Sequence, residues 1–474
     1  MTPLALAALC AGIAIALIVV IRPRGLTQSR AGRVFRLGKM SARISASWVG
    51  ARARRLFASR ERRVHLDESA RKESAALVAR TMGEMKGALM KLGQMLSFVS
   101  EDVPPEMRAA LQSLQASAPP MDFALLRDQA ERDLGRPLER AFARFDSQPL
   151  ASASIGQVHR AQLPDGREVV VKIQYPGVAD AIRADLANAG LLYRFVGMAY
   201  PNLEPGPVVD ELRARIGEEL DYGREADNQR KFHRRYQGHR HIRVPAVVDS
   251  HSAGLVLTTE YAEGRRFAAV AGDSQAARDR YGEIIYRFVF GSVLRDGSFN
   301  GDPHPGNYLF GDDHVVFLDF GCVKFFPEPM LGQWKSLVKA WLSGDRAQFR
   351  ETLVTLRFIK EDGPLPADLL AEYFGYFYEP WAEDRVFQFT REYNRQSFRH
   401  IFAPEGKFAG FSKHLNMPPD FVFVNRIQWG VYSILADLGA TGNWHRIHRE
   451  YLYGEPPSTP IGEAELAAQA SPPP

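Results

Sequence analysis

The sequence predicts an α+β protein with two lobes, a small lobe built on a β-sheet and a larger lobe built of helices. The segment VHRAQLPDGREVVVKIQY, which begins at Val158, is typical of two strands joined by a turn at 164–166, because Pro, Asp and Gly favour tight turns. Two further strands are expected within 241–261, and helical patterns dominate from 263 onward. Of the 474 residues, 45% are hydrophobic and 24% are charged, which is the composition of an ordinary globular protein.

An apolar segment precedes the two lobes. Residues 4–21, LALAALCAGIAIALIVVI, carry no charge. As a helix with a rise of ~1.5 Å per residue they would reach ~27 Å, close to the thickness of the hydrocarbon core of a bilayer. A cleaved signal peptide is disfavoured, because no basic residue precedes the run and Arg22 and Arg24 follow it at once. We therefore predict a single N-terminal transmembrane helix, an anchor over 1–24.

Positive charge is concentrated directly behind this anchor. Residues 22–63 contain thirteen Lys or Arg and one acidic residue, whereas the formal net charge of the whole chain is only +5. The positive-inside rule then places the body of the chain in the cytoplasm, with 25–66 as a basic juxtamembrane linker on the membrane lipids. Because the basic charge is confined to this linker, no nucleic-acid partner is expected. The only two cysteines, Cys10 and Cys322, exclude a disulfide framework and a cysteine-based zinc site.

The remaining chain divides into four predicted parts. They are a helical extension over 67–148, the small lobe over 149–262, the helical lobe over 263–453 and a tail over 454–474. Apolar residues at spacings of three and four predict the long helix of the extension. The tail is rich in Pro and Ala, and we expect it to be disordered.

Five short motifs follow one another through the two lobes. They are ASASIGQV at 151–158, VVVKIQY at 169–175, EELDYGREADN at 218–228, DPHPGN at 302–307 and FLDFG at 317–321. Together they place one lysine, one glutamate, two aspartates and one asparagine in the order in which a two-lobed protein-kinase-like fold holds ATP and magnesium. The sequence therefore predicts ATP and Mg²⁺ as cofactors.

Lys172 stands inside an apolar strand, in the sequence VVVK. A lysine among valines is ordinarily an edge residue, but the motifs downstream give this one a specific catalytic role, which is to bind the α- and β-phosphates. Glu225 is its expected partner, on a helix predicted over 207–235. Glu260 ends the last strand of the small lobe, in GLVLTTEYAEG, and is also expected at the cofactor site.

Asp302 and Asn307 are five residues apart, which is the spacing of the base and a magnesium ligand in a kinase catalytic loop. The alternative is a proline-rich turn capped by Asp302. Asp319 follows twelve residues after Asn307, at the end of a buried strand predicted over 315–318, where it would be the main magnesium ligand. An Asp and an Asn side chain supply the oxygen ligands that Mg²⁺ prefers.

The predicted phosphate loop departs from the kinase pattern. A glycine-rich loop lets backbone N–H groups approach phosphates closely, whereas this loop contains Ala151, Ser152, Ala153 and Ser154. Because their Cβ atoms restrict the loop, we expect the phosphates to be held differently and rapid protein phosphorylation to be disfavoured. The sequence after FLDFG also leaves no room for a long activation segment, so the usual platform for peptide substrates is missing.

With these residues the chain resembles the ABC1/UbiB/ADCK (AarF-like) family of atypical kinase-like proteins, over roughly 70–325. Two motifs are specific to that family, KLGQ from Lys91 to Gln94 and the ExD element of Glu219 and Asp221. The resemblance implies that the KLGQ segment folds over the active site and that these four residues are regulatory. It also implies an atypical kinase or ATPase that supports isoprenoid-lipid (ubiquinone or quinone) biosynthesis, with prenylated quinone precursors and quinone-biosynthesis proteins as partners.

Two features of the sequence keep other functions open. The family commonly has a histidine and an alanine directly before the catalytic-loop aspartate, where this chain has Asn300 and Gly301. The sequence GDPHPGN is also similar to that of small-molecule phosphotransferases. The alternatives are therefore a kinase that transfers phosphate to a small molecule or a lipid, and a nucleotide-gated lipid-binding scaffold without turnover.

Overall fold

The computed structural model describes residues 122–153, 155–179, 217–300, 303–402 and 418–470, together with 407, 408, 410, 411 and 414–416. The predicted anchor, the basic linker and most of the helical extension lie outside these residues, and so do Lys91, Gln94, Ser154 and Asp302. Within the described part, no helix combines the length and the apolar character needed to cross a bilayer. The mixture of sheets and helices confirms the α+β class.

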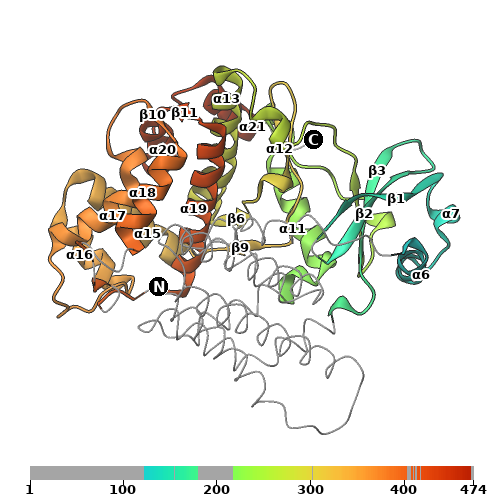
Figure 1. The fold of residues 1–474 in the computed structure, drawn as a ribbon, viewed down its shortest axis with the longest axis horizontal. Helices are drawn as coiled ribbons and strands as arrows, with labels where there is room; N and C mark the ends of the chain where they lie inside the picture. Colours follow the sequence, from blue (N-terminus) through green and yellow to red (C-terminus); the bar gives the residue numbers. More distant parts are fainter. Residues whose placement is uncertain are drawn as a thin grey trace, which may run out of the picture. The chain divides into compact units, whose positions relative to one another are not determined.

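The small lobe contains two short helices and a four-stranded sheet, at the right of Figure 1, where all of these elements except β5 are blue-green. The helices are α6 (Phe123–Leu134) and α7 (Leu138–Ala141), and the strands, in the order in which they pair, are β1 (Arg144–Ser152), β2 (Gly156–Gln162), β3 (Glu168–Gln174) and β5 (Val256–Glu260). β3 and β5 are antiparallel, with Lys172 opposite Leu257. Val171 and Ile173 are fully buried, so the alternation of side chains along a strand places Lys172 on the other face of the sheet.

The hairpin of β2 and β3 has the turn that the sequence predicts. Gly166 has a φ of +90°, a left-handed conformation that favours glycine, and its N–H donates to the carbonyl of Leu163 at 3.0 Å. The carboxylate of Asp165 accepts a hydrogen bond from the backbone N–H of Arg167 at 3.0 Å. This turn chemistry fixes the register of the two strands.

β1 begins earlier than the predicted boundary of the small lobe. Its sequence, RFDSQPLAS, lies partly in a segment expected to be helical, and its residues are exposed or half-buried. An exposed strand buries no regular apolar face, so the period of two that identifies strands is absent from its sequence. The helical prediction up to 148 is therefore wrong from Arg144 onward.

α11 (Tyr222–Arg235) is shorter than the helix predicted over 207–235. Asp221 has an extended backbone (φ −107°, ψ 94°), and its carboxylate accepts a hydrogen bond from the backbone N–H of Arg224 at 3.1 Å. Asp221 is therefore the N-cap that starts α11. The prediction that Glu219 and Glu225 lie on one continuous helix is wrong, because this cap separates them.

Three short strands, β4 (Ile242–Arg243), β7 (Tyr308–Phe310) and β8 (Val315–Phe317), form a second sheet in the order β4-β8-β7. β4 runs parallel to β8, and β7 and β8 form an antiparallel hairpin. We expected β4 in the sheet of the small lobe, but it pairs with β8 instead. A further pair, β6 (Ser298–Asn300) and β9 (Val323–Phe325), is antiparallel. The DPHPGN and FLDFG motifs lie between these strands.

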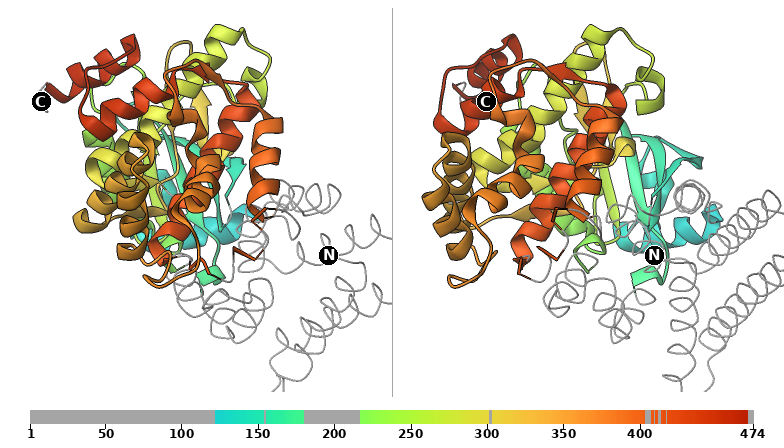
Figure 2. Two further views of the ribbon diagram at one scale, coloured as in Figure 1. Left: turned by 90° about the vertical axis from the view of Figure 1, so that its left-hand side faces the viewer. Right: turned by 60° about the vertical axis from the view of Figure 1, so that its left-hand side comes forward.

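The helical lobe surrounds these strands with a mainly α-helical structure. Its helices are α12 (Phe267–Val270), α13 (Gln275–Tyr286), α14 (Ser292–Asp296), α15 (Glu328–Ser343), α16 (Arg346–Thr355), α17 (Ala367–Ala382), α18 (Arg391–Phe402), α19 (Pro419–Leu438), α20 (Trp444–Tyr453) and α21 (Pro460–Ala470). Shorter elements are η1 (Asp249–His251), the π turn η2 (Arg287–Gly291), η3 (Pro305–Asn307), β10 (Phe387–Gln388) and β11 (Thr441–Gly442). α19 packs against α13 and α18, and α17 packs against α20. In Figure 2, α17 to α20 are orange to red and α13 is yellow-green. Trp334, Trp381 and Trp444 are buried in this core.

α21 lies in the tail that we predicted to be disordered, and a buried arginine holds it in place. The guanidinium of Arg287 contacts Glu283 at 2.7 Å, Glu450 of α20 at 2.7 Å and Glu465 of α21 at 3.3 Å. A buried guanidinium needs such acceptors, because without them its charge would be costly to bury. The prediction of disorder is therefore wrong for 460–470, and the reason is a tertiary contact that composition does not reveal.

Candidate active site

The centre of the candidate site is an ion pair between β3 and α11. The ammonium nitrogen of Lys172 lies 2.7 Å and 2.8 Å from the two carboxylate oxygens of Glu225. The side chain of Glu225 is only 3% exposed and that of Lys172 is 18% exposed. Glu225 reaches the lysine from the first turn of α11, whose start Asp221 fixes. These are the two residues that the sequence pairs.

A third charged residue, Asp319, completes the electrostatics of this centre. Its Oδ2 atom lies 3.9 Å from Nζ of Lys172. Burial alone disfavours the ammonium form of the lysine, but the carboxylates of Glu225 and then Asp319 outweigh it, so the pKa of Lys172 is raised. The charged form of Lys172 is therefore favoured beside Glu225 and Asp319.

Two hydrogen bonds hold Asp319 at the end of β8. Its Oδ1 atom accepts a hydrogen bond from the N–H of Gly321 at 2.9 Å, and the side-chain amide of Asn300 donates to its backbone carbonyl. A Cβ atom on Gly321 would lie 3.4 Å from Asp319 Oδ1 and 3.4 Å from Glu225 Oε2, so glycine leaves room between the two carboxylates. The Asp319 side chain is 36% exposed, so its carboxylate, which lies near Lys172, is also partly accessible to a ligand.

The same face of α11 also binds the residue after Asp319. The side-chain amide of Asn228 donates to the carbonyl of Phe320 at 3.1 Å, and the ring of Phe232 lies 5.0 Å from the fully buried ring of Phe320. Glu225, Asn228 and Phe232 are three and four residues apart and so share one face of the helix. α11 therefore positions Lys172 and the FLDFG segment together.

Asn307 lies beside Asp319 because of the β7–β8 hairpin. The backbone N–H of Leu318 donates to the carbonyl of Asn307 at 3.0 Å, and Tyr308 pairs with Phe317. The Nδ1 atom of His304 accepts a hydrogen bond from the N–H of Gly306 at 3.0 Å, so this histidine stabilises the loop. Asn307 directly precedes β7 and Asp319 follows β8, so the two predicted magnesium ligands lie at the same end of the hairpin.

The donor set fits a magnesium ion that also binds phosphate. Asp319 offers a partly exposed carboxylate, and Asn307 is the last residue of the short helical turn η3. Mg²⁺ is commonly held by one or two such side chains, with phosphate oxygens and water as its other ligands. In the described part of the chain, no cluster of three or more His, Cys, Asp or Glu side chains suited to a metal occurs.

A comparison with protein families decides the identity of this fold. The family model for the ABC1 atypical kinase-like domain matches residues 113–353, which is just over half of the chain. The chain belongs to this family. It therefore has the kinase-like fold that its motifs predict, and its relatives are atypical kinases.

Two curated relatives are named atypical kinases. The atypical kinase coq-8 of Caenorhabditis elegans, a mitochondrial protein, is 28% identical over 395 residues, which cover 81% of this chain and 52% of the relative. The atypical kinase COQ8 of Saccharomyces cerevisiae is 30% identical over 285 residues, which cover 60% of this chain and 57% of the relative. The chain thus spans about half the length of these curated relatives.

A solved structure supports the same fold. The structure of Rv3197 from Mycobacterium tuberculosis in complex with erythromycin has 31% sequence identity and a TM-score of 0.58 to this chain. The similarity covers 83% of this chain and 97% of that one.

The alanine-rich loop of this ABC1 protein is closed by its own backbone. Ala151 and Ser152 belong to the end of β1, so the loop is shorter than its sequence suggests. The N–H of Ala153 donates to the carbonyl of Gly156 at 2.9 Å, and the N–H of Tyr175 donates to the carbonyl of Ile155 at 2.9 Å. The N–H of Ala153 is therefore already engaged.

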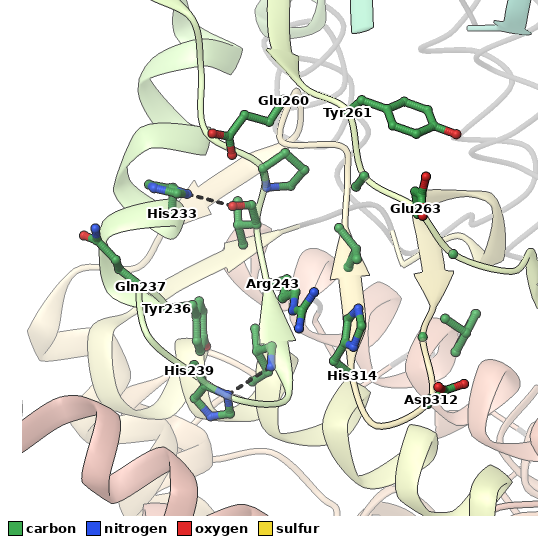
Figure 3. A pocket seen from close by; sticks show the side chains of 18 of the residues that line it. His233, Tyr236, Gln237, His239, Arg243, Glu260, Tyr261, Glu263, Asp312 and His314 are labelled. Carbon is green, nitrogen blue, oxygen red and sulfur yellow. Dashed lines mark hydrogen bonds between the residues drawn. The ribbon is translucent and has the colours of Figure 1, made fainter. Parts of the chain in front are cut away.

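Glu260 is the predicted cofactor residue that the structure separates from Lys172. Its Oε2 atom accepts a hydrogen bond from the N–H of Ala246 at 3.1 Å, and its own N–H donates to the carbonyl of Ala246. The side chain lines a cavity of about 840 Å³, shown in Figure 3, whose lining does not include Lys172, Glu225 or Asp319. A cofactor contact by Glu260 would thus have to come from its backbone.

Sequence reasoning missed two asparagines that organise the site. Asn300 was noted only as a departure from the family pattern, and Asn228 was not assigned any role. The position of Asn300, two residues before Asp302, was the available signal, because a histidine in that place is part of the kinase catalytic-loop motif. Asn228 could have been found from its spacing of three from Glu225, which predicts a shared helix face.

Proposed function

We propose that this chain is a membrane-anchored atypical ATPase or kinase that binds Mg-ATP between its two lobes. The observation that carries this proposal is the buried Lys172–Glu225 pair with Asp319 beside it. A lysine that stays charged at the end of a β-strand, next to a half-exposed carboxylate, suits the phosphates of a nucleotide and a divalent cation.

Each residue of the site has a separate part in the proposal. Lys172, oriented by Glu225, donates hydrogen bonds to phosphate oxygens, and Asp319 and Asn307 hold the magnesium ion, which neutralises charge on the phosphates. Asn300 keeps the backbone of Asp319 in place. Asp302 orients the acceptor hydroxyl or a water molecule. Ala151, Ser152, Ala153 and Ser154 contact the nucleotide less closely than a glycine-rich loop does.

The cellular role rests on the family and on the N-terminal sequence. We propose that the apolar run 4–21 anchors the chain in the cytoplasmic membrane and that the basic residues of 22–63 lie on anionic lipids. Lys91, Gln94, Glu219 and Asp221 would restrict access of protein substrates, so the ATP-dependent step would serve isoprenoid-lipid (quinone) biosynthesis. A prenylated quinone precursor is the proposed lipid ligand.

ATP hydrolysis by the full chain tests this proposal. The rate is measured in vesicles with and without anionic lipid and a prenylated phenol, for the native chain, for Asp319→Asn and for the control Asp249→Asn. Asp249 is 70% exposed and pairs with Arg230 at the surface, so its neutralisation should leave the rate unchanged. Hydrolysis that responds to lipid and is lost only in Asp319→Asn is the expected result. Equal rates in native and Asp319→Asn chains would refute the assignment of the site.

A further inference from the structure

The cavity next to Glu260 is a second candidate ligand site. We call it the β4 cavity, because β4 forms its floor between the C-terminal turn of α11, the chain at 260–265 and the β7–β8 hairpin. Its volume of about 840 Å³ is within the range of pockets that bind small molecules. All of its lining residues are distinct from the ion pair and from Asp319, so it is a site apart from the proposed nucleotide site.

Close contacts at glycines shape two walls of the β4 cavity. A Cβ atom built on Gly311 would lie 2.2 Å from the imidazole ring of His314, and a Cβ atom on Gly264 would lie 2.8 Å from Cβ of Leu309. Any larger residue at these two positions would push the walls apart. The cavity is therefore bounded by tightly packed backbone and by a histidine ring that rests on Gly311.

The guanidinium of Arg243 stands in the middle of this cavity (Figure 3). Arg243 lies opposite Val316 in the parallel β4–β8 pair. His314 is two residues before Val316, so the side chains of all three residues are on the same face of the sheet. Among the described residues, Arg243 has no hydrogen-bond or ion-pair partner. Arg265, in contrast, is held by Asp273 at 2.6 Å and 2.9 Å and by the hydroxyl of Tyr281. The cavity thus presents one cation that is not neutralised by the part of the protein described.

Groups of the opposite charge lie along one edge of the same cavity. The side chains of Glu263 and Asp312 are exposed, and Figure 3 shows them on the side away from α11. In the described part of the chain, neither carboxylate has a hydrogen-bond partner. Across the cavity, Nδ1 of His233 contacts the carbonyl of Val244 at 2.7 Å and therefore donates, which leaves its Nε2 atom for a ligand. The lining offers an anion-binding centre together with acceptors for hydroxyl or amino groups.

We propose that the β4 cavity binds a small polar molecule with a phosphate or carboxylate group at one end and hydroxyl or amino groups at the other. The anionic group binds to Arg243, since a guanidinium matches the geometry of phosphate and carboxylate oxygens. The hydroxyl or amino groups donate to Glu263 and Asp312. This binding site is independent of ATP, and the proposal does not depend on whether the chain hydrolyses ATP.

Titration calorimetry with glycerol 3-phosphate tests the site, because this probe has both kinds of group. The full chain in non-ionic detergent is compared with Arg243→Gln, Arg243→Lys and the control Arg240→Gln. Arg240 is 73% exposed, pairs with Asp313 at the surface and does not line the cavity. Lys172→Met is included because phosphate could also bind at the ion pair.

The expected result is weaker binding of the probe by at least about tenfold, or about 1.4 kcal/mol, in Arg243→Gln only. Arg243→Lys should retain part of the affinity, and Arg240→Gln and Lys172→Met should bind as the native chain does. Glycerol alone should bind far more weakly than glycerol 3-phosphate. Binding to vesicles of phosphatidylglycerol is measured as a second arm. If the chain binds the vesicles through Arg243 but does not bind glycerol 3-phosphate, the anionic ligand is a lipid headgroup.

Two outcomes would overturn the proposal. One is equal affinity of the native chain and Arg243→Gln for the probe that binds. The other is a native chain that binds neither glycerol 3-phosphate nor the vesicles in an Arg243-dependent way at concentrations up to about 10 mM.

Discussion

Replacing Glu225 by glutamine tests how the ion pair contributes to the site. Glutamine has nearly the same shape, so α11 and its contacts to Phe320 should remain. The change removes one negative charge from Lys172, which then has, among the described residues, Asp319 at 3.9 Å as its anionic partner. The lysine should therefore move toward Asp319 and away from the position in which it meets phosphate oxygens.

The size of the effect follows from the two hydrogen bonds of the pair. Both are short, at 2.7 Å and 2.8 Å, and the glutamate is buried, so solvent screens them little. Glutamine keeps one acceptor, and the net loss is that of one charge-assisted hydrogen bond, about 2 kcal/mol. If the transition state for hydrolysis loses this full stabilisation, kcat/KM decreases by about 30-fold.

The assay is ATP hydrolysis by the full chain, with thermal unfolding measured on the same samples. Asp227→Asn is the matched control, because Asp227 lies on the same helix, is 69% exposed and pairs with Arg230. We expect the control to change kcat/KM by less than about twofold. The reasoning would be refuted by a Glu225→Gln chain that folds and hydrolyses ATP at the native rate, or by a control that loses as much activity.

Three further predictions concern other parts of the molecule. Asn300→Ala removes the donor to the Asp319 carbonyl and should lower kcat/KM by about tenfold, whereas Asn300→His should retain activity. Equal rates for the two variants would contradict this role of Asn300. Arg287→Met removes the guanidinium that pairs with the buried Glu450 and leaves Glu465 paired with Arg295. It should lower the free energy of unfolding by about 3 kcal/mol in urea titrations, so an unchanged midpoint would show that α21 is held otherwise. Burial lowers the pKa of His448 to about 3, below its ordinary value of 6.5, so the folded state resists its protonation and stability should fall as the pH decreases from 6.5 toward 3. The slope should reach about 1.4 kcal/mol per pH unit from this residue, and His448→Asn should make it shallower; an equal slope would exclude His448 as the cause.

The sequence predicts the parts of the site that local chemistry determines. The strand of Lys172 is identified by its valines, the hairpin by its turn residues, and the Asp319 strand by its apolar run. The pairing of Lys172 with Glu225 could be expected because the motifs fix which helix follows the strand. In each case the pattern spans only a few residues and does not depend on distant parts of the chain.

Tertiary contacts decide the features that the sequence did not reveal. α21 is helical because Glu465 meets Arg287, a residue 178 positions away, and no local pattern in a Pro- and Ala-rich tail indicates such a partner. β4 pairs with β8 because Val315 lies beside Ile242, although the chain between them first passes through several helices and strands. The break before α11 depends on one side chain, Asp221, that can either cap a helix or lie within one.

The most direct test of the central claim is magnesium-dependent ATP binding by the native chain and by Asp319→Asn, followed by thermal unfolding with ATP and with or without Mg²⁺. The account predicts that Mg²⁺ strengthens ATP binding to the native chain by at least about tenfold and raises its unfolding temperature, and that Asp319→Asn loses this dependence on the metal. Retention of the full magnesium effect in a folded Asp319→Asn chain would contradict the placement of the metal and of the nucleotide at this site.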